Sequence, residues 1–152
     1  MRIGVLSDSH KDELSDDDLR KLKDLQADLI VHCGDFTGER VLEQLKEFGK
    51  FLGVAGNMDS PDIKKKLKGK EILEAEGKII GVTHGYGFFT DHKLEEMFKE
   101  EEIDIFFYGH THSLRKEIKE GIYYLNPGPF RQSMLLVTIE KDKDINVELR
   151  RL

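Results

Sequence analysis

The feature that most limits the fold of this chain is a series of short apolar runs, each of which stops at a polar residue of the kind that binds metal ions. In the first, Ile3–Leu6 is followed by Asp8 and His10. If the run is a buried strand, these side chains leave its carboxyl end, where the crevice above a mostly parallel sheet usually carries the chemistry. Four later runs repeat the design: Leu29–Cys33 before Asp35, Phe51–Ala55 before Asn57, Lys78–Thr83 before His84, and Ile103–Tyr108 before His110 and His112.

Helical patterns separate several of these runs. Ser15 followed by three aspartates is typical of a helix N-cap with an acidic first turn, so we interpret Asp16–Asp18 as structural rather than as a metal cluster. Gly38–Phe48 is amphipathic and stops at Gly49, and Thr90 can cap a helix running to about Glu101. Strands that alternate with helices predict an α/β fold in which right-handed crossovers bring the strand ends to one edge.

Antiparallel pairs complete the expected fold. They are Glu71–Ala75 with Lys78–Thr83, Leu114–Lys119 with Ile122–Leu125, and Met134–Glu140 with Ile145–Leu149. The sequence contains no internal repeat, low-complexity segment or linker. We therefore expect a single domain over residues 1–152.

Composition restricts the partners. The formal charge is −6, from 24 basic and 30 acidic residues, so no overall basic field is present to hold the backbone of a long nucleic acid. Cys33 is the single cysteine, which excludes an internal disulfide, fits a reducing cytoplasm and is interpreted as packing. No stretch is long enough for a signal-peptide core or a membrane span. The expected setting is the cytoplasm, with no membrane contact.

Several polar residues receive structural interpretations. His32 lies inside an apolar run, where a hydrogen-bonded structural histidine is commoner than a ligand. His92 falls in the first turn of an expected helix and has at most a minor site role. The basic run Lys64–Lys66 is either a solvated face, the commoner case, or a group that steers an anion.

The strand-end residues form a set of seven nitrogen and oxygen donors. These are too many for one tetrahedral zinc, but they suit two cations that share a carboxylate, for which Asp35 is the natural bridge. The charge of two dications exceeds the negative charge of Asp8, Asp35 and a bridging hydroxide. The pocket would therefore carry a net positive charge, which favours phosphate esters. Two metal ions that lie roughly 3.5–4 Å apart can activate a water molecule and bind the oxygens of a phosphoryl group. The seven are Asp8, His10, Asp35, Asn57, His84, His110 and His112.

The same residues resemble a known family. The motifs in order closely resemble those of the calcineurin-like metallophosphoesterases, in particular their small prokaryotic phosphodiesterase branch. The resemblance spans residues 1 to about 130, and the ordered set is highly specific although any one piece is not. The motifs are D-S-H at Asp8–His10, G-D at Gly34 and Asp35, G-N at Gly56 and Asn57, T-H-G at Thr83–Gly85, G-H-T-H at Gly109–His112, and N-P-G-P at Asn126–Pro129.

The resemblance implies a fold, a site and an activity. The fold would be an α/β, two-layer mixed β sandwich flanked by α-helices. Two divalent metal ions, manganese first and nickel, iron or zinc as alternatives, would hold a hydroxide that hydrolyses a small phosphodiester. A homodimer is left open. By position, Asp8, His10 and His112 would hold the first metal, and Asn57, His84 and His110 the second, with Asp35 bridging; Asp35, Asn57 and His110 would also act in catalysis, and Asn57 would contact the substrate.

Two positions depart from the family pattern. Met58 stands where many larger relatives have a histidine that is proposed to protonate the leaving group, and members of the small branch commonly lack it. Its absence predicts better turnover of esters with good leaving groups. Tyr86 stands where small relatives often have a second histidine. We predict that Tyr86 is a substrate-binding residue, and leave open whether it contacts the phosphate, stacks on a base or lines the rim.

Two other kinds of protein could carry a site of this type. A non-catalytic scaffold or binding protein can use the same fold, as in the retromer subunit that resembles this family, but such proteins typically lose ligands and none is missing here. The interpretation as a purely structural metal site is weaker still, because such sites are usually closed by four ligands and this sequence offers seven. The sequence therefore favours an enzyme.

Overall fold

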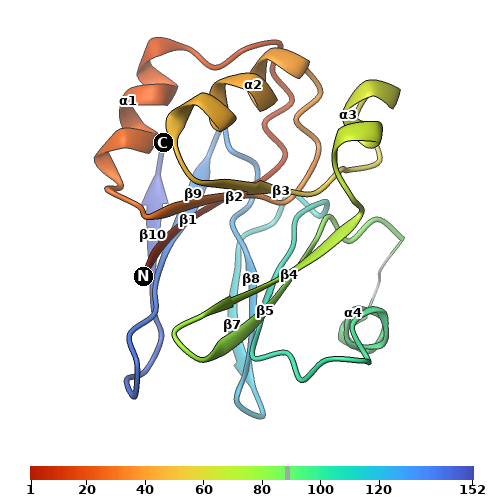
Figure 1. The fold of residues 1–152 in the computed structure, drawn as a ribbon, viewed down its shortest axis with the longest axis vertical. Helices are drawn as coiled ribbons and strands as arrows, with labels where there is room; N and C mark the ends of the chain where they lie inside the picture. Colours follow the sequence, from red (N-terminus) through yellow and green to blue (C-terminus); the bar gives the residue numbers. More distant parts are fainter. Residues whose placement is uncertain (88–89) are drawn as a thin grey trace.

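The computed structural model describes residues 1–87 and 90–152, and its strands form two sheets (Figure 1). In the first sheet the strand order is β10-β9-β1-β2-β3. The three strands that lead to Asp8, Asp35 and Asn57 are parallel neighbours, whereas β9 pairs antiparallel with β1 on one side and with β10 on the other. The bounds are β1 Arg2–Leu6, β2 Leu29–His32, β3 Phe51–Gly53, β9 Ser133–Thr138 and β10 Asn146–Arg151.

The second sheet has the order β4-β5-β6-β8-β7. Its three central strands are parallel, and each edge strand pairs antiparallel with its neighbour. The strands before His84 and His110 are β5 and β6, so these histidines belong to a different sheet from Asp8 and Asp35. The bounds are β4 Lys70–Ala75, β5 Lys78–Thr83, β6 Ile105–Phe107, β7 Arg115–Lys119 and β8 Ile122–Asn126.

Four helices among the described residues cover the outer faces of the sheets. In Figure 1, α1 and α2 lie over the first sheet and α4 lies beside the second. A cluster of buried side chains joins α1 and α2 to the first sheet, and a smaller one around Phe98, Phe106 and Tyr124 joins α4 to the second. The expected α/β sandwich flanked by helices is confirmed. The helices are α1 Asp16–Asp24, α2 Glu39–Phe48, α3 Pro61–Lys66 and α4 Asp91–Met97.

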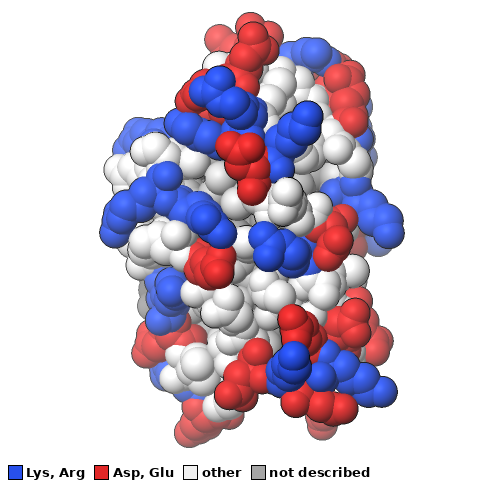
Figure 2. Space-filling model, turned by 90° about the vertical axis from the view of Figure 1, so that its left-hand side faces the viewer, with Lys and Arg blue, Asp and Glu red and all other residues white. Residues whose placement is uncertain are grey.

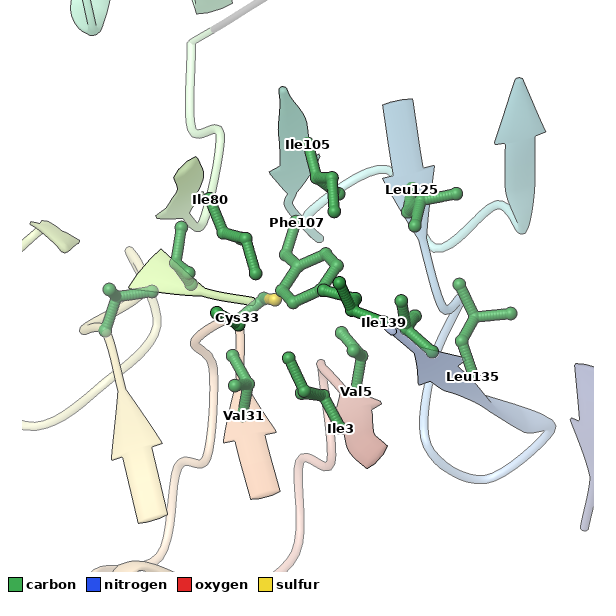
Figure 3. Close-up of a cluster of buried hydrophobic side chains, with 14 residues drawn as sticks. Ile3, Val5, Val31, Cys33, Ile80, Ile105, Phe107, Leu125, Leu135 and Ile139 are labelled. Atoms are coloured by element: carbon green, nitrogen blue, oxygen red, sulfur yellow. The ribbon is translucent and has the colours of Figure 1, made fainter. Parts of the chain in front are cut away.

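The main core lies between the two sheets. Alternate residues of β1, such as Ile3 and Val5, meet Ile80 and Phe107 of the second sheet (Figure 3). Burial of these apolar side chains is the dominant force holding the sheets together. Cys33 is buried in this cluster, and burial raises the pKa of its thiol well above the ordinary value, so its interpretation as packing is confirmed.

Most predicted elements form, with shifted ends. Ser15 caps α1 in a capping box with Asp18, and Thr90 caps α4, as expected. The helix from Thr90 was predicted too long: it ends at Met97 instead of Glu101. Its last turn contains no basic residue and acidic residues follow, which disfavours extension at the negative end of the helix dipole.

Several strands are also shorter than predicted. The run Ile103–Tyr108 contributes only Ile105–Phe107, and Phe51–Ala55 only Phe51–Gly53. At the carboxyl end of each run the chain leaves the sheet early to form the loop that carries the polar residues, and β6 also begins two residues later than predicted. No helix in the described ranges is long and apolar enough to cross a membrane. Figure 2 shows basic and acidic side chains interspersed over one face of the molecule. That residues 1–152 form a single domain stays a prediction.

Candidate metal centre

Loops from both sheets bring six of the seven predicted ligands together, and Asn57 lies between Gly56 and Met58, which both approach the Asp35 carboxylate. Backbone hydrogen bonds tie these loops to one another: Asp8 N–H donates to Gly34 O at 3.0 Å, and Gly109 N–H donates to His84 O at 3.1 Å. A Cβ at Gly56 would overlap the Asp35 carboxylate, and one at Gly109 would overlap the Ser7 hydroxyl. Glycine is therefore required at these two motif positions, because a side chain there would overlap the neighbouring loop.

Five of the seven predicted ligands have a left-handed backbone conformation. Their φ angles are positive, which non-glycine residues adopt rarely and at a cost of about 1 kcal/mol or more each. Such strain persists where the surrounding structure imposes it, and it concentrates at functional sites. The values are 53° for Asp8, 45° for His10, 60° for Asp35, 67° for His110 and 56° for His112.

Asp8, His10 and His112 form a first group. Their candidate ligand atoms all lie within 4.8 Å of one another. His112 Nε2 is 3.2 Å from Asp8 Oδ1, and His10 Nε2 is 3.7 Å from the same oxygen. The structure therefore brings His112 to Asp8 and His10, which lie about a hundred positions earlier in the sequence.

Asp35, His84 and His110 form a second group with the same 4.8 Å limit. His84 Nε2 lies 3.2 Å from Asp35 Oδ2 and 3.3 Å from His110 Nδ1. The groups adjoin, because His10 Nε2 of the first group lies 3.6 Å from the same Asp35 oxygen. Asp35 is thus positioned between the two groups, where a bridging carboxylate would lie.

Two oxygen atoms at this centre lack partners. Asp8 Oδ1 and Asn57 Oδ1 are buried and accept no hydrogen bond from the described residues. A buried polar atom without a partner is destabilising by about 1–3 kcal/mol, and such atoms are rare in native proteins. Together with the facing imidazole nitrogens, they fit a donor set for divalent cations.

The electrostatics of the centre point the same way. Burial alone would lower the pKa of His84, but the carboxylates of Asp35 and Asp8 outweigh it and the pKa lies above its ordinary value. Burial opposes ionisation of Asp35, yet His84 and the Met58 N–H hold the pKa of that carboxyl below its usual range. The pocket therefore concentrates negative charge that favours cations.

Hydrogen bonds behind the centre orient the ligand atoms. His84 Nδ1–H donates to Cys33 O at 2.8 Å, which leaves Nε2 facing the carboxylates. Ser7 Oγ–H and His110 N–H donate to Asp8 Oδ2, and Met58 N–H donates to Asp35 Oδ1 at 2.8 Å. In each case one ligand atom is occupied and the other is presented to the centre, as is usual around bound metals.

Asp59 was missed by the sequence analysis. It is buried, and Oδ2 accepts hydrogen bonds from Asp35 N at 2.9 Å and Gly56 N at 2.7 Å, while Oδ1 accepts one from Thr37 N at 3.0 Å. Its carboxylate thereby joins the loops that carry Asp35 and Asn57. The available signal was a buried turn whose amides need acceptors, with one carboxylate at the right distance along the chain.

Asp59→Asn is expected to lower the free energy of unfolding by about 1–3 kcal/mol, because an amide NH₂ would face backbone N–H donors that a carboxylate now satisfies. Denaturant unfolding of the variant beside exposed Asp144→Asn checks this. A loss no larger than that of Asp144→Asn would contradict the assigned contacts.

The remaining polar residues lie outside the centre or at its rim. His32 is fully buried: Nδ1 accepts from Gly34 N–H, Nε2 lies 3.0 Å from Ser9 Oγ, and burial lowers its pKa to about 3, so its structural interpretation is confirmed. His92 is exposed. Lys64 is exposed and bonds Asn57 O at 3.2 Å. Tyr86 is 66% exposed and meets the His110 ring edge to face at 5.4 Å.

The chain is similar to known proteins over most of its length. Residues 1–142 match the model of the calcineurin-like phosphoesterase superfamily domain. A probable metallophosphoesterase of Methanocaldococcus jannaschii is 38% identical over 133 residues, covering 84% of this chain and 67% of the relative. A phosphodiesterase of the same organism is 28% identical over 144 residues, covering 84% and 83%.

Solved structures show the same fold. A Thermotoga maritima protein solved by NMR has a TM-score of 0.79 and 33% identity, with 99% of both chains covered. Vps29 of Entamoeba histolytica, solved as a complex with zinc, has a TM-score of 0.79 and 21% identity, again with 99% of both chains covered. At that identity the second likeness concerns the fold alone.

Proposed function

The chain belongs to the calcineurin-like phosphoesterase superfamily, and on that basis we propose that it hydrolyses small phosphodiesters with two divalent cations. The observation that supports this most is the pair of adjoining donor groups around Asp35. Asp8, His10 and His112 would hold one cation; Asn57, His84 and His110 would hold the other. A pair of bound cations supplies an acidified water and withdraws charge from phosphoryl oxygens.

Residues of the chain itself prepare this centre. The Met58 N–H and the Asp59 carboxylate fix the side chain and the backbone of Asp35, respectively, while the Cys33 carbonyl fixes the His84 ring. Asn57 and Tyr86 are proposed to contact the substrate: the Nδ2 amide of Asn57 can donate to a phosphoryl oxygen while Oδ1 would face the cation, and Tyr86 stands exposed beside His110. Manganese is the proposed metal, and the cytoplasm the proposed location.

Protein stripped with a chelator is expected to be inactive and to regain hydrolysis of bis(4-nitrophenyl) phosphate when manganese is added. The reason is that the bound cations, and not the side chains that hold them, would activate the attacking water. Nickel, iron and zinc are tested in parallel, and the metal content is measured. Metal binding without cleavage of any ester under any of these ions would instead support a non-catalytic scaffold function. A pull-down would then test for a binding partner.

Alkyl phosphodiesters are expected to be cleaved more slowly than aryl diesters by a factor of roughly 10² or more, because a positioned general acid contributes about that much and none stands at Met58. Met58 is 60% exposed at the rim, so Met58→His has room for a proton donor. The variant should narrow the gap between the two substrates. An equal change in both rates would argue that this position does not serve the leaving group.

A further inference from the structure

A pocket of about 120 Å³ lies beside the proposed metal centre, between α4, the end of β6 and the start of β7. We call it the α4 pocket. Gly85 directly follows the predicted ligand His84, and Thr111 lies between His110 and His112, so the pocket adjoins the second donor group. Leu94 supplies an apolar wall, and the polar lining consists of Gly85, Thr90, Asp91, Tyr108, Thr111 and Arg115.

The charged groups of the α4 pocket neutralise one another. Arg115 donates to both oxygens of Asp91 at 2.7 and 2.9 Å, and its Nε donates to Glu117 at 2.7 Å. Lys119 donates to Asp91 Oδ2 at 2.7 Å. Two positive and two negative groups leave no net charge and no free guanidinium edge, so the lining does not favour a second phosphate.

Three hydroxyls of the α4 pocket already act as acceptors. Tyr108 Oη accepts from Arg115 at 3.0 Å, Thr111 Oγ1 accepts from Asn126 Nδ2 at 3.0 Å, and Thr90 Oγ1 accepts from a backbone N–H at 3.3 Å. Within residues 1–87 and 90–152, none of the three hydroxyl protons has an acceptor. Because a hydroxyl carries one donor as well as acceptor lone pairs, these groups can donate to a ligand.

The size of the α4 pocket limits that ligand. A cavity volume of about 120 Å³ is well below the roughly 300–1,000 Å³ of pockets that enclose drug-sized ligands, so it suits a small polyol better than a base with its sugar. We propose that the α4 pocket binds the alcohol portion of the phosphodiester, a hydroxyl-bearing alcohol of about the size of glycerol, with the Tyr108 hydroxyl donating to one of its oxygens. The inference rests on the proposed phosphodiesterase activity.

Titration calorimetry of the metal-loaded protein with glycerol 3-phosphate and with inorganic phosphate tests this proposal. Wild type is expected to bind glycerol 3-phosphate about tenfold more tightly than phosphate. One additional hydrogen bond contributes roughly that difference in affinity. Tyr108→Phe removes a single oxygen and should erase most of this preference while changing the phosphate affinity less than twofold. Tyr123→Phe on β8, outside the pocket lining, is the matched control and should keep the preference.

The outcomes separate the pocket from the activity. Equal affinity of wild type for the two probes, or an equal loss for both in Tyr108→Phe, would overturn the α4 pocket proposal even if aryl diesters are hydrolysed. A retained preference for glycerol 3-phosphate in a protein that hydrolyses no ester would support the pocket and refute the enzyme. Preserved thermal unfolding of Tyr108→Phe shows that a loss of preference is not a loss of folding.

Discussion

Asp35→Asn should reduce the turnover of bis(4-nitrophenyl) phosphate by at least about 10³-fold, equivalent to roughly 4 kcal/mol of transition-state stabilisation. Histidines of both donor groups approach the same oxygen of Asp35, with Oδ2 3.2 Å from His84 Nε2 and 3.6 Å from His10 Nε2. Asparagine preserves the shape and can still accept from Met58 N–H through its oxygen, but it removes the charge that two cations would share. The expected loss is therefore chemical rather than structural.

Metal content supplies the second readout for Asp35. The variant should bind fewer than two equivalents of manganese, whereas Asp24→Asn, on the exposed end of α1, should retain both the metal and the rate. Full turnover in Asp35→Asn would remove the bridging role. Lost turnover with both metals retained would show that Asp35 acts on the reaction without holding the ions.

The sequence predicts which residues belong to the metal centre. Their spacing along the chain does not predict how they divide into two groups. A buried strand that ends in a polar residue is a local signal, so Asp8, Asp35 and His84 could be identified one by one. Which donors face each other depends on how two sheets meet, and sequence distance does not encode this: His112 joins Asp8, whereas His110, two residues earlier, joins His84. The family resemblance supplied the division between two metals; the structure brings Asp8, His10 and His112 together and Asp35, His84 and His110 together, and the place of Asn57 on the second metal stays a prediction.

The elements were easier to predict than their ends. Ser15 and Thr90 are local caps, and both cap helices as expected. The ends of β3 and α4 depend on where a loop must turn toward the site and on helix-terminal charge, and there the sequence pattern overestimated their length. Asp59 shows the same limit at the site, because its three backbone partners lie on two separate loops.

Asp91→Asn is expected to lower the free energy of unfolding by about 1–2 kcal/mol at pH 7. Arg115 binds both oxygens of Asp91 and, with Lys119, lowers the pKa of that carboxyl from 3.8 to about 2. That difference corresponds to somewhat more than 2 kcal/mol by linkage, and partial exposure of the pair reduces it. Asp17→Asn, at an exposed ion pair with Lys21, is the control and should lose less.

The pH dependence separates the ion pair from other effects of the substitution. Because the folded-state pKa of Asp91 lies below the unfolded value, its contribution is complete above about pH 4 and disappears as the pH falls through about 2. The difference in unfolding free energy between wild type and Asp91→Asn should therefore shrink over that window. The facing groups Arg115 and Lys119 stay charged throughout it, because the Asp91 carboxylate raises the pKa of both. A difference that stays constant down to pH 2 would assign the effect to helix packing and not to the charge that holds α4 against β7.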